Sequence, residues 1–545
     1  MRPILQTNAI LFLGQNIKFD INVLRAACDI TVSNVYDTMV TERLLQAGLR
    51  ESAALDALVL KYLDRPMDKS LQKSFQNFSG YFSNSQYEYS AKDVEVLFPI
   101  RERQLTRIRD AGLGAVLDLE SSLVPVIADM EFTGVFLDRD IWTKLVEYSE
   151  QELIAYRYKL TKTMSYGGYQ LGLFEGFVSG LNLDSSDQVL RAFHEKGINV
   201  PDTNNITLLD YMRESELANR NLDRVALIKE LLTYRQFTKN LSTYGTSFLD
   251  NINSHTGFVH TSFNQVGGET REVATGRLSS NNPNLQNIPT RSYGDLSFRS
   301  AFRAREGNSF VGADLSQIEL RIMAEFSGET ALIDAFNTGA DIHKLTASRM
   351  FGIPLDEVTK EQRGLGKTLN FSTLYGASGP KIATLLYENG TVVTIEKASQ
   401  LLDSFKKGYP AIFRWTDRTG NEAVSSRETR TALGRRRSFI PPDYFDPYYR
   451  KKLAALKREA ANQPIQGTSA EILKIAMVEI AKRFKKLNAH LILSVHDELI
   501  AEVKDAYVQE ATAILKEELE GAGARFLHSV PVLAEPAITK YWSKG

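Results

Sequence analysis

Apolar and polar residues recur along the chain in patterns that predict several long helices and a few short strands. Helix-like spacing of apolar residues, about three to four positions apart, occurs in three stretches, 102–120, 138–160 and 222–248. Strand-like apolar runs occur in three others, 309–313, 491–495 and 499–503. The glycine- and aromatic-rich stretch 165–182 predicts a loop. The pattern indicates helices around a small sheet, which we expect to be antiparallel and to carry the chemistry.

The composition is that of a soluble globular protein with several folding units. A chain of 545 residues exceeds one ordinary core, so about three or four units are expected. No run reaches the roughly 18 apolar residues of a membrane span, and the apolar stretch 9–13 is too short for a signal peptide. Because Cys28 is the only cysteine, neither an internal disulfide nor a zinc site of several cysteines is expected, which favours a reducing, cytosolic setting.

The net charge of −1 does not suggest a nucleic-acid partner, but cations gather in one segment. Between 427 and 458 the chain carries Arg427, Arg430, Arg435, Arg436, Arg437, Arg450, Lys451, Lys452, Lys457 and Arg458. Such a segment is either a solvated helix face or a stripe that follows a phosphate backbone. Charge alone slightly favours the solvated face.

Carboxylates stand at the ends of the predicted strands. Asp314 follows the strand 309–313, while Asp497 and Glu498 lie in the turn between the two later strands. Taken singly, Asp314 is a helix cap and the acidic pair is a solvated turn. If the strands share a sheet, the carboxylates lie side by side and repel each other unless a divalent cation joins them. Two magnesium ions about 3.5–4 Å apart can activate a hydroxyl and stabilise a leaving oxygen.

A third element combines cations and aromatic rings on one helix face. Arg363, Lys367, Phe371 and Tyr375 recur every fourth residue, and Gly376 is suited to end the helix. One interpretation is an ordinary amphipathic helix with aromatic rings inward and cations outward. The other is a nucleotide site, in which the cations hold a triphosphate and the rings meet a sugar and a base.

These motifs together resemble those of family A DNA polymerases, the group of bacterial DNA polymerase I and its large (Klenow) fragment. The similarity rests on five segments in the family's order: 275–280 with its continuation 284–289, 314–321, 363–376, 462–468 and 495–498. Each segment is moderately specific by itself, whereas all five in order leave little room for coincidence. With gaps, the resemblance runs from about Gly14 to the C-terminus.

The resemblance implies template-directed DNA synthesis by two-metal phosphoryl transfer, with primer–template DNA and deoxynucleoside triphosphates as partners. The implied cofactor is a pair of Mg²⁺ ions, for which Mn²⁺ can substitute. The implied catalytic residues are Asp314, Asp497, Glu498, Lys367 and Arg363, and the metal ligands are Asp314, Asp497 and the carbonyl of Leu315. Implied nucleotide contacts are Arg363, Lys367, Phe371, Tyr375, His343, Glu319 and Gln317. Implied DNA contacts are Arg277, Arg458, Asn462, Gln466 and His496.

The implied fold is an α/β and α+β multidomain protein shaped as a right hand behind a partial RNase H-like exonuclease domain. We expect the exonuclease-like part at 1–104, the thumb at 105–249, the fingers at 322–454, and the palm in two parts, 250–321 and 455–545.

The exonuclease part resembles its family only in places. Asn16 and Asp20 match its second motif, and Tyr89 and Asp93 its third, but the upstream Asp-x-Glu pair is absent. We therefore expect a truncated domain and no proofreading by this chain alone. Either the domain is a remnant, or a separate polypeptide supplies the missing part.

Two other functions were weighed. A related single-subunit RNA polymerase is disfavoured by Glu319 and by the turn 495–498. A catalytically inactive DNA-binding scaffold is disfavoured by the intact residues Asp314, Asp497, Arg363 and Lys367.

Overall fold

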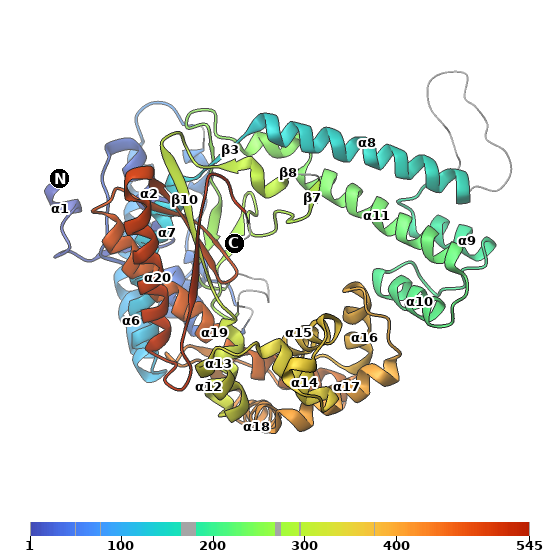
Figure 1. Cartoon of the computed structure of the whole chain (residues 1–545). Coiled ribbons are helices and arrows are strands. Elements are labelled where there is room, and N and C mark those ends of the chain that lie inside the picture. Colours follow the sequence, from blue (N-terminus) through green and yellow to red (C-terminus); the bar gives the residue numbers. More distant parts are fainter. Residues whose placement is uncertain are drawn as a thin grey trace, which may run out of the picture.

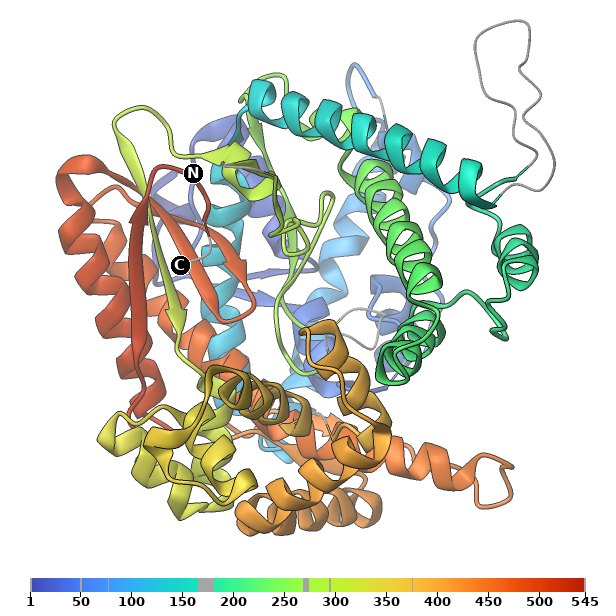
Figure 2. The same ribbon diagram turned by 45° about the vertical axis from the view of Figure 1, so that its right-hand side comes forward.

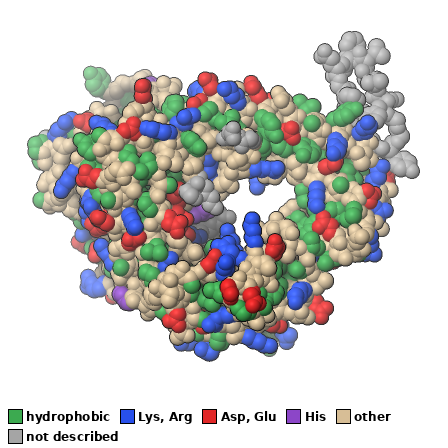
Figure 3. Space-filling view, viewed as in Figure 1, with side chains coloured by type: hydrophobic (Ala, Val, Ile, Leu, Met, Phe, Trp, Pro, Cys, Tyr) green, Lys and Arg blue, Asp and Glu red, His purple; other side chains and the backbone are tan. Residues whose placement is uncertain are grey.

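The computed structural model describes residues 2–49, 51–76, 78–164, 181–267, 274–293, 296–374 and 376–543. Helices and short sheets form several units around a central opening, and Lys and Arg side chains gather along its lower rim (Figures 1 and 3). The predicted mixed multidomain fold is confirmed. Most of the loop predicted at 165–182 lies outside the described residues. No described helix combines the length and apolarity needed to cross a membrane.

The central sheet contains the three predicted strands. Its order is β13 (His490–Val495), β14 (Glu498–Lys504), β10 (Asn308–Leu315) and β15 (Ala534–Thr539), and each neighbouring pair is antiparallel, as expected. Successive side chains of a strand point to opposite faces. On β10, Val311, Ala313 and Leu315 join the largest core, whereas Phe310 joins a second core on the other face.

The largest core connects the sheet with long helices and a helical unit. It contains residues of α7 (Gly114–Thr133), α19 (Tyr449–Phe484) and α20 (Val508–Ala524). It continues into the unit made of α12 (Ile318–Ser327), α13 (Thr330–Thr338), α14 (Ile342–Phe351), α15 (Lys360–Leu374), α16 (Gly379–Glu388), α17 (Ile395–Gly408) and α18 (Pro410–Ser426). A Cβ on Gly366 of α15 would lie 2.3 Å from the carbonyl oxygen of His343. Glycine there allows α14 and α15 to pack closely.

Two long helices extend away from the sheet, as the apolar spacing predicted. They are α8 (Arg139–Met164) and α11 (Leu222–Tyr244), which lie side by side in both views (Figures 1 and 2). At their far end, α9 (Ser186–Glu195) and α10 (Asn205–Leu217) complete a separate core. The second helix is shorter than predicted, because a 3-10 turn, Thr246–Asn251, follows it.

The N-terminal unit has a parallel sheet of two strands, β1 (Phe12–Gly14) and β2 (Val35–Asp37). Its helices are α1 (Arg2–Leu5), α2 (Ile17–Cys28), α3 (Thr38–Leu45), α4 (Leu55–Leu63), α5 (Asn84–Glu95) and α6 (Leu97–Asp110). The stretch 102–120 is helical as predicted, except for residues 111–113, which lie between α6 and α7. Gly112 has φ +64° and separates α6 from α7, which is a conformation that favours glycine.

Short antiparallel pairings connect these units. Strand β3 (Val135–Leu137) lies between β4 (Phe258–Val259) and β9 (Phe302–Arg303). Three further two-stranded pairs are β5 (Ser262–Asn264) with β6 (Ser279–Asn281), β7 (Ser292–Tyr293) with β8 (Leu296–Ser297), and β11 (Glu428–Arg430) with β12 (Arg436–Ser438).

Candidate active site

The predicted carboxylates meet at one end of the central sheet. Asp314 of β10 is the register partner of Glu498 of β14, and the amide of Leu315 donates to the carbonyl of Asp497 at 3.2 Å. His496, with φ +55°, forms the tight turn before this pair. Asp314 is a strand residue at an exposed position, and the helix cap of α12 is Gln317 instead. The pairing of β10 with β14 therefore brings Asp314, Asp497 and Glu498 side by side.

An arginine lies among these acids. Arg277 forms an ion pair with the buried Glu319, and its Nη2 atom is 3.8 Å from Asp497 Oδ1. The hydroxyl of Ser469 on α19 donates to the same Asp497 oxygen at 3.2 Å. The guanidinium balances part of the negative charge that the carboxylates concentrate here.

The donor atoms at this end of the sheet suit a hard divalent cation. The side chains of Asp314 and Asp497 and the carbonyl of Leu315 offer only oxygen, which Mg²⁺ prefers. In the described part of the chain, no three His, Cys, Asp or Glu side chains converge around one point as metal ligands would. The strand pairing places Asp314 beside Asp497 and Glu498, so the oxygen donors available at this end of the sheet fit a divalent cation by their chemistry.

Helix α15 presents a cationic and aromatic face. Arg363 Nε is 2.6 Å from Asp341 Oδ2, and Asp341 also accepts the amides of His343 and Lys344 at the start of α14. Burial favours a higher pKa for Asp341, but the hydrogen bond from Arg363 favours a lower one, and the net effect is a lowered pKa. Lys367 is exposed on this face. Sequence reasoning missed Asp341, which holds Arg363 in place.

His343 is fixed as a neutral donor beside this face. Its Nδ1 accepts a hydrogen bond from Asn370 Nδ2 at 3.0 Å, so the neutral ring carries its proton on Nε2. Burial, and secondly the charge of Arg363, lower the pKa of His343 to about 4. The ring lies 5.7 Å from that of Phe371, which is 38% exposed and open to a ligand. The predicted nucleotide contact Tyr375 lies outside the described residues.

A polar stripe runs along α19. Arg458, Asn462 and Gln466 recur every fourth residue on a face that is at least partly exposed, while the residues around them are mostly buried. A Cβ on Gly376 would lie 2.6 Å from Arg458 Cδ, so this arginine packs against the chain just after α15. Three of the predicted DNA contacts therefore share one helix face.

Two members of the cationic segment 427–458 fit neither the solvated face nor the phosphate stripe, because both are buried. Arg435 is 1% exposed and pairs with Glu120 and Glu471, while the buried Arg437 pairs with Glu459 at 2.8 Å. These two arginines are buried and paired with carboxylates of the chain itself.

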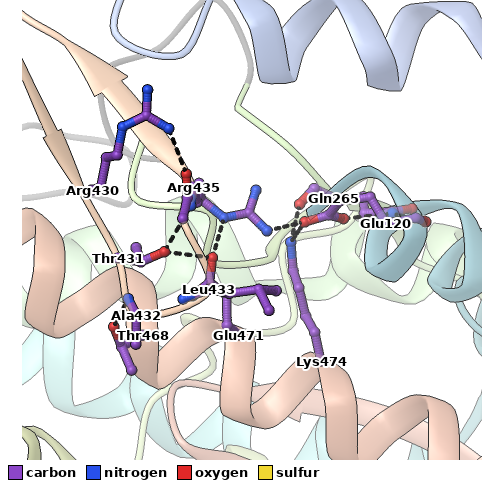
Figure 4. Close-up of polar contacts among 11 residues, drawn as sticks. Glu120, Gln265, Arg430, Thr431, Ala432, Leu433, Arg435, Thr468, Glu471 and Lys474 are labelled. Carbon is purple, nitrogen blue, oxygen red and sulfur yellow. Dashed lines mark hydrogen bonds and ion pairs between the residues drawn. The ribbon is translucent and has the colours of Figure 1, made fainter. Parts of the chain in front are cut away.

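Two groups of acids and bases were missed by sequence reasoning. Glu120, Arg435, Glu471 and Lys474 form a buried charge cluster between α7, the β11–β12 hairpin and α19 (Figure 4). The available signal was a charged pair, Glu471 and Lys474, within an otherwise apolar part of α19. The other missed group contains Asp37 in the N-terminal unit.

Asp37 belongs to the part of the exonuclease-like unit that carries the second predicted motif. It accepts the amides of Asn16 and Ile17 at 3.1 and 2.8 Å, and burial raises its pKa. Asp20, on the first turn of α2, has a pKa raised by burial and by the charge of Asp37. Asp37 also caps α3 by accepting the amides of Met39 and Val40, and its charge reaches Asp20.

The third predicted exonuclease motif lies on α5 with different neighbours. Burial raises the pKa of Asp93, and the charge that acts on it is that of Lys69. The Tyr89 ring packs 5.8 Å from Phe75. The charges that act on Asp93 and on Asp20 are therefore those of different residues.

Comparisons with known proteins agree with this geometry. Residues 169–544 match the family description "DNA polymerase family A", and residues 1–108 match "3'-5' exonuclease". A DNA polymerase I of Chloroflexus aurantiacus is 36% identical over 523 residues, which cover 92% of this chain and 52% of that protein. A DNA polymerase I of Pseudomonas aeruginosa is 32% identical over 570 residues, covering 100% of this chain and 58% of that protein. The chain thus spans little more than half the length of these curated relatives.

A solved structure resembles nearly the whole chain. It is the POL domain of Pol1 from M. smegmatis in complex with DNA primer-template and dNTP. The TM-score is 0.82 at 26% identity, and the match covers 99% of this chain and 88% of that one.

Proposed function

Because the chain belongs to DNA polymerase family A, we propose that it extends a DNA primer by copying a template strand from deoxynucleoside triphosphates. The observation that carries this proposal is the pairing of β10 with β14, which sets Asp314 beside Asp497 and Glu498. The relative from M. smegmatis holds DNA primer-template and dNTP, which supports the same partners for this chain.

The parts of a right hand are assigned as follows. The sheet and the helices packed on it are the palm, α8 to α11 are the thumb, and α13 to α18 are the fingers. The bounds expected from the sequence were 105–249 for the thumb and 322–454 for the fingers, and the assigned helices lie within both ranges. Helix α7 packs in the core of the sheet, so we begin the thumb at α8.

The metal ligands are Asp314, Asp497 and the carbonyl of Leu315, with Glu498 beside them. Two Mg²⁺ ions, when bound there, supply activation of the primer hydroxyl and stabilisation of the leaving oxygen, and Mn²⁺ has similar ligand preferences. The all-oxygen donor set of the paired strands supports this assignment.

The exposed face of α15 binds the triphosphate. Arg363 and Lys367 offer positive charge, and His343 offers an uncharged Nε2–H donor. Lys367 is placed to donate a proton to the departing pyrophosphate. Phe371 packs against the sugar, with Tyr375 by the templating base. Such positioning, combined with charge stabilisation, accounts for most of the catalysis of phosphoryl transfer.

The sugar and the duplex are held from the palm. Glu319, with Gln317 just before it, closes the space beside a 2′-hydroxyl and so selects deoxyribose. Arg277, His496 and the α19 stripe of Arg458, Asn462 and Gln466 contact the duplex in its minor groove. The minor groove offers acceptors at similar places for every base pair, so these contacts test the shape of a pair without reading its sequence.

Primer extension with purified chain tests this function. Asp314→Ala and Asp497→Ala should each lower extension by several orders of magnitude, because both ions lose a ligand. Asp334→Ala, a change of an exposed aspartate on α13, serves as the matched control and should extend normally. Extension by either site variant within about tenfold of the unchanged chain would overturn the two-metal assignment.

We also propose that this chain alone does not proofread. The charge of Asp37 acts on Asp20 of α2, whereas the charge of Lys69 acts on Asp93 of α5, and these different charged neighbours support the proposal. Purified chain with Mg²⁺ or Mn²⁺ should leave a mismatched 3′ primer end intact when nucleotides are omitted. Degradation that disappears in Asp20→Ala would contradict the proposal. Degradation that needs a second polypeptide would identify a partner that completes the domain.

A further inference from the structure

The buried charge cluster consists of Glu120, Arg435, Glu471 and Lys474, none more than 1% exposed. Arg435 Nε lies 3.2 Å from Glu471 Oε1, and its Nη2 pairs with Glu120. Lys474 Nζ is 2.6 Å from Glu120 Oε1 (Figure 4). Two positive and two negative groups therefore connect α7, the turn before β12 and α19.

The turn that carries Arg435 is fastened to α19. Thr431 Oγ1 donates to Glu471 Oε1 at 2.8 Å and accepts the amide of Arg435 at 2.9 Å. The amide of Leu433 donates to Glu471 Oε2 at 3.3 Å. These bonds give the guanidinium a defined position relative to the palm.

The cluster also holds both legs of the loop between β5 and β6. On the first leg, Gln265 Nε2 donates to Glu120 Oε2 at 2.6 Å, and the Gln265 carbonyl accepts from Lys474 at 2.8 Å. On the second leg, Gly276 has φ +88°, and a Cβ added there would lie 2.7 Å from Arg435 Nε. The backbone at Gly276 therefore rests directly on the Arg435 guanidinium.

Arg277 follows immediately and reaches the carboxylates of the candidate active site. It pairs with Glu319 and lies 3.8 Å from Asp497. A Cβ on Gly467 of α19 would lie 3.1 Å from the Thr275 carbonyl, so the loop also touches the helix just before this point. The backbone position that rests on Arg435 is thus directly adjacent to the residue whose side chain enters the site.

We propose that the buried charge cluster positions Arg277, and that Arg435 is the positioning residue on which its loop rests. The inference extends the proposed function, in which Arg277 holds the primer–template. Arg435 touches neither substrate nor metal ligand in this arrangement. It acts by fixing the backbone from which Arg277 reaches Glu319 and Asp497.

The chemistry of the cluster favours a role in geometry over one in stability. Buried ion pairs can often be replaced by apolar residues with no loss of stability. A planar guanidinium can contact two carboxylates and support a peptide plane, whereas an ammonium group offers a single charged point. Arg435→Lys therefore keeps the charge and removes the planar support under Gly276.

A double-mutant cycle with Arg277→Ala tests the coupling. Arg435→Lys should lower kcat/KM for adding one nucleotide to a matched primer by about tenfold. In the Arg277→Ala background the same change should alter kcat/KM by less than about twofold, because the residue being positioned is gone. Arg483→Lys, an exposed arginine of α19 paired with Glu517 and Glu518, is the control and should change neither background. If Arg435→Lys lowers kcat/KM by the same factor with and without Arg277→Ala, the two residues act independently and the proposal is overturned.

Amide hydrogen exchange provides a readout that does not require activity. Arg435→Lys should speed exchange at the amides of 275–278 while leaving β10 and β14 unchanged. If Arg435→Lys does not fold, Glu471→Gln removes one partner of Arg435 and should give the same pattern. Unchanged exchange at 275–278 in a folded variant would overturn the inference even if extension is impaired. If the unchanged chain fails to extend primers but exchange responds as expected, the proposed function fails and the support of the loop stands.

Discussion

Removing the charge of Glu120 should destabilise the chain by an amount that depends on pH. Glu120→Gln retains the shape of the side chain and leaves Arg435 and Lys474 with Glu471 as their only carboxylate in the cluster. Burial would raise the pKa of Glu120, but Lys474 and Arg435 lower it, so the wild-type carboxylate is charged at pH 7. A buried charge left without its partner costs about 3–5 kcal/mol.

Lys474 limits this cost because it can release its proton. Burial lowers the pKa of Lys474 to about 8, and loss of Glu120 lowers it further. In the wild type, releasing this proton at pH 7 costs about 1.4 kcal/mol, because pH 7 is one unit below the pKa, and the cost is smaller in the variant. Arg435 cannot lose its proton, but it retains Glu471. We therefore expect a loss of about 3 kcal/mol at pH 7, at the low end of the range for an unpaired buried charge.

The sign of the pH dependence follows from proton binding. At pH values between the Lys474 pKa of the variant and about 8, the pKa in the wild type, Lys474 is mostly neutral in the folded variant and mostly protonated in the folded wild type. The folded variant therefore binds fewer protons than the folded wild type. Its stability therefore rises with pH relative to wild type. The loss should shrink to roughly half by pH 8.5, because wild-type Lys474 then also releases its proton.

Thermal unfolding at pH 6.5, 7 and 8.5 measures the effect. A loss of about 3 kcal/mol corresponds to a fall in Tm of roughly 6–12 °C for a cooperative unit of about 150–250 residues. Asp118→Asn is the matched control, since Asp118 is an exposed acid of the same helix. A second comparison removes Lys474 from both variants. The difference in stability between Glu120→Gln/Lys474→Met and Lys474→Met should not vary with pH in this range. A loss that grows with pH, or a Tm equal to wild type at pH 7, would refute the reasoning.

Three further outcomes are expected. Glu319→Ala should raise ribonucleotide incorporation relative to deoxyribonucleotide incorporation, and an unchanged ratio in a primer-extension assay would exclude Glu319 from the sugar pocket. Because the pKa of His343 is lowered to about 4, the native state binds fewer protons than the unfolded chain between pH 4 and its ordinary value. Acidification from pH 6.5 to 5 should therefore cost about 2 kcal/mol of stability through this residue, and a Tm–pH curve unaltered by His343→Gln would contradict this. Neutralising the exposed Arg450 and Lys451 should lower the slope of log DNA affinity against log salt, whereas Arg437→Ala, which changes an inward-facing arginine, should leave the slope unchanged.

Local patterns were sufficient for the elements that carry the chemistry. The apolar runs before Asp314 and around Asp497 predicted strands, and both are strands of one antiparallel sheet. The four-residue spacing from Arg363 predicted the helix that became α15. Such predictions succeed because side-chain periodicity reports which face of an element is buried, and neighbours in sequence determine it. The helical stretch predicted at 102–120 is interrupted, because Gly112 turns the chain between α6 and α7.

The sequence by itself determined which side chains are available to the site, whereas the tertiary structure decided their partners. Arg435 looked like a member of an exposed cationic stripe, yet its partner Glu120 is 315 positions away and both are buried. Arg277 likewise meets Glu319, which is 42 positions away, only after β5, β6 and α12 pack together. Whether a charge contacts solvent, DNA or another charge depends on which surfaces the folded chain brings together. The energy of an ion pair depends on the separation of the charges in space and on their burial. Composition and spacing along the chain do not specify either quantity.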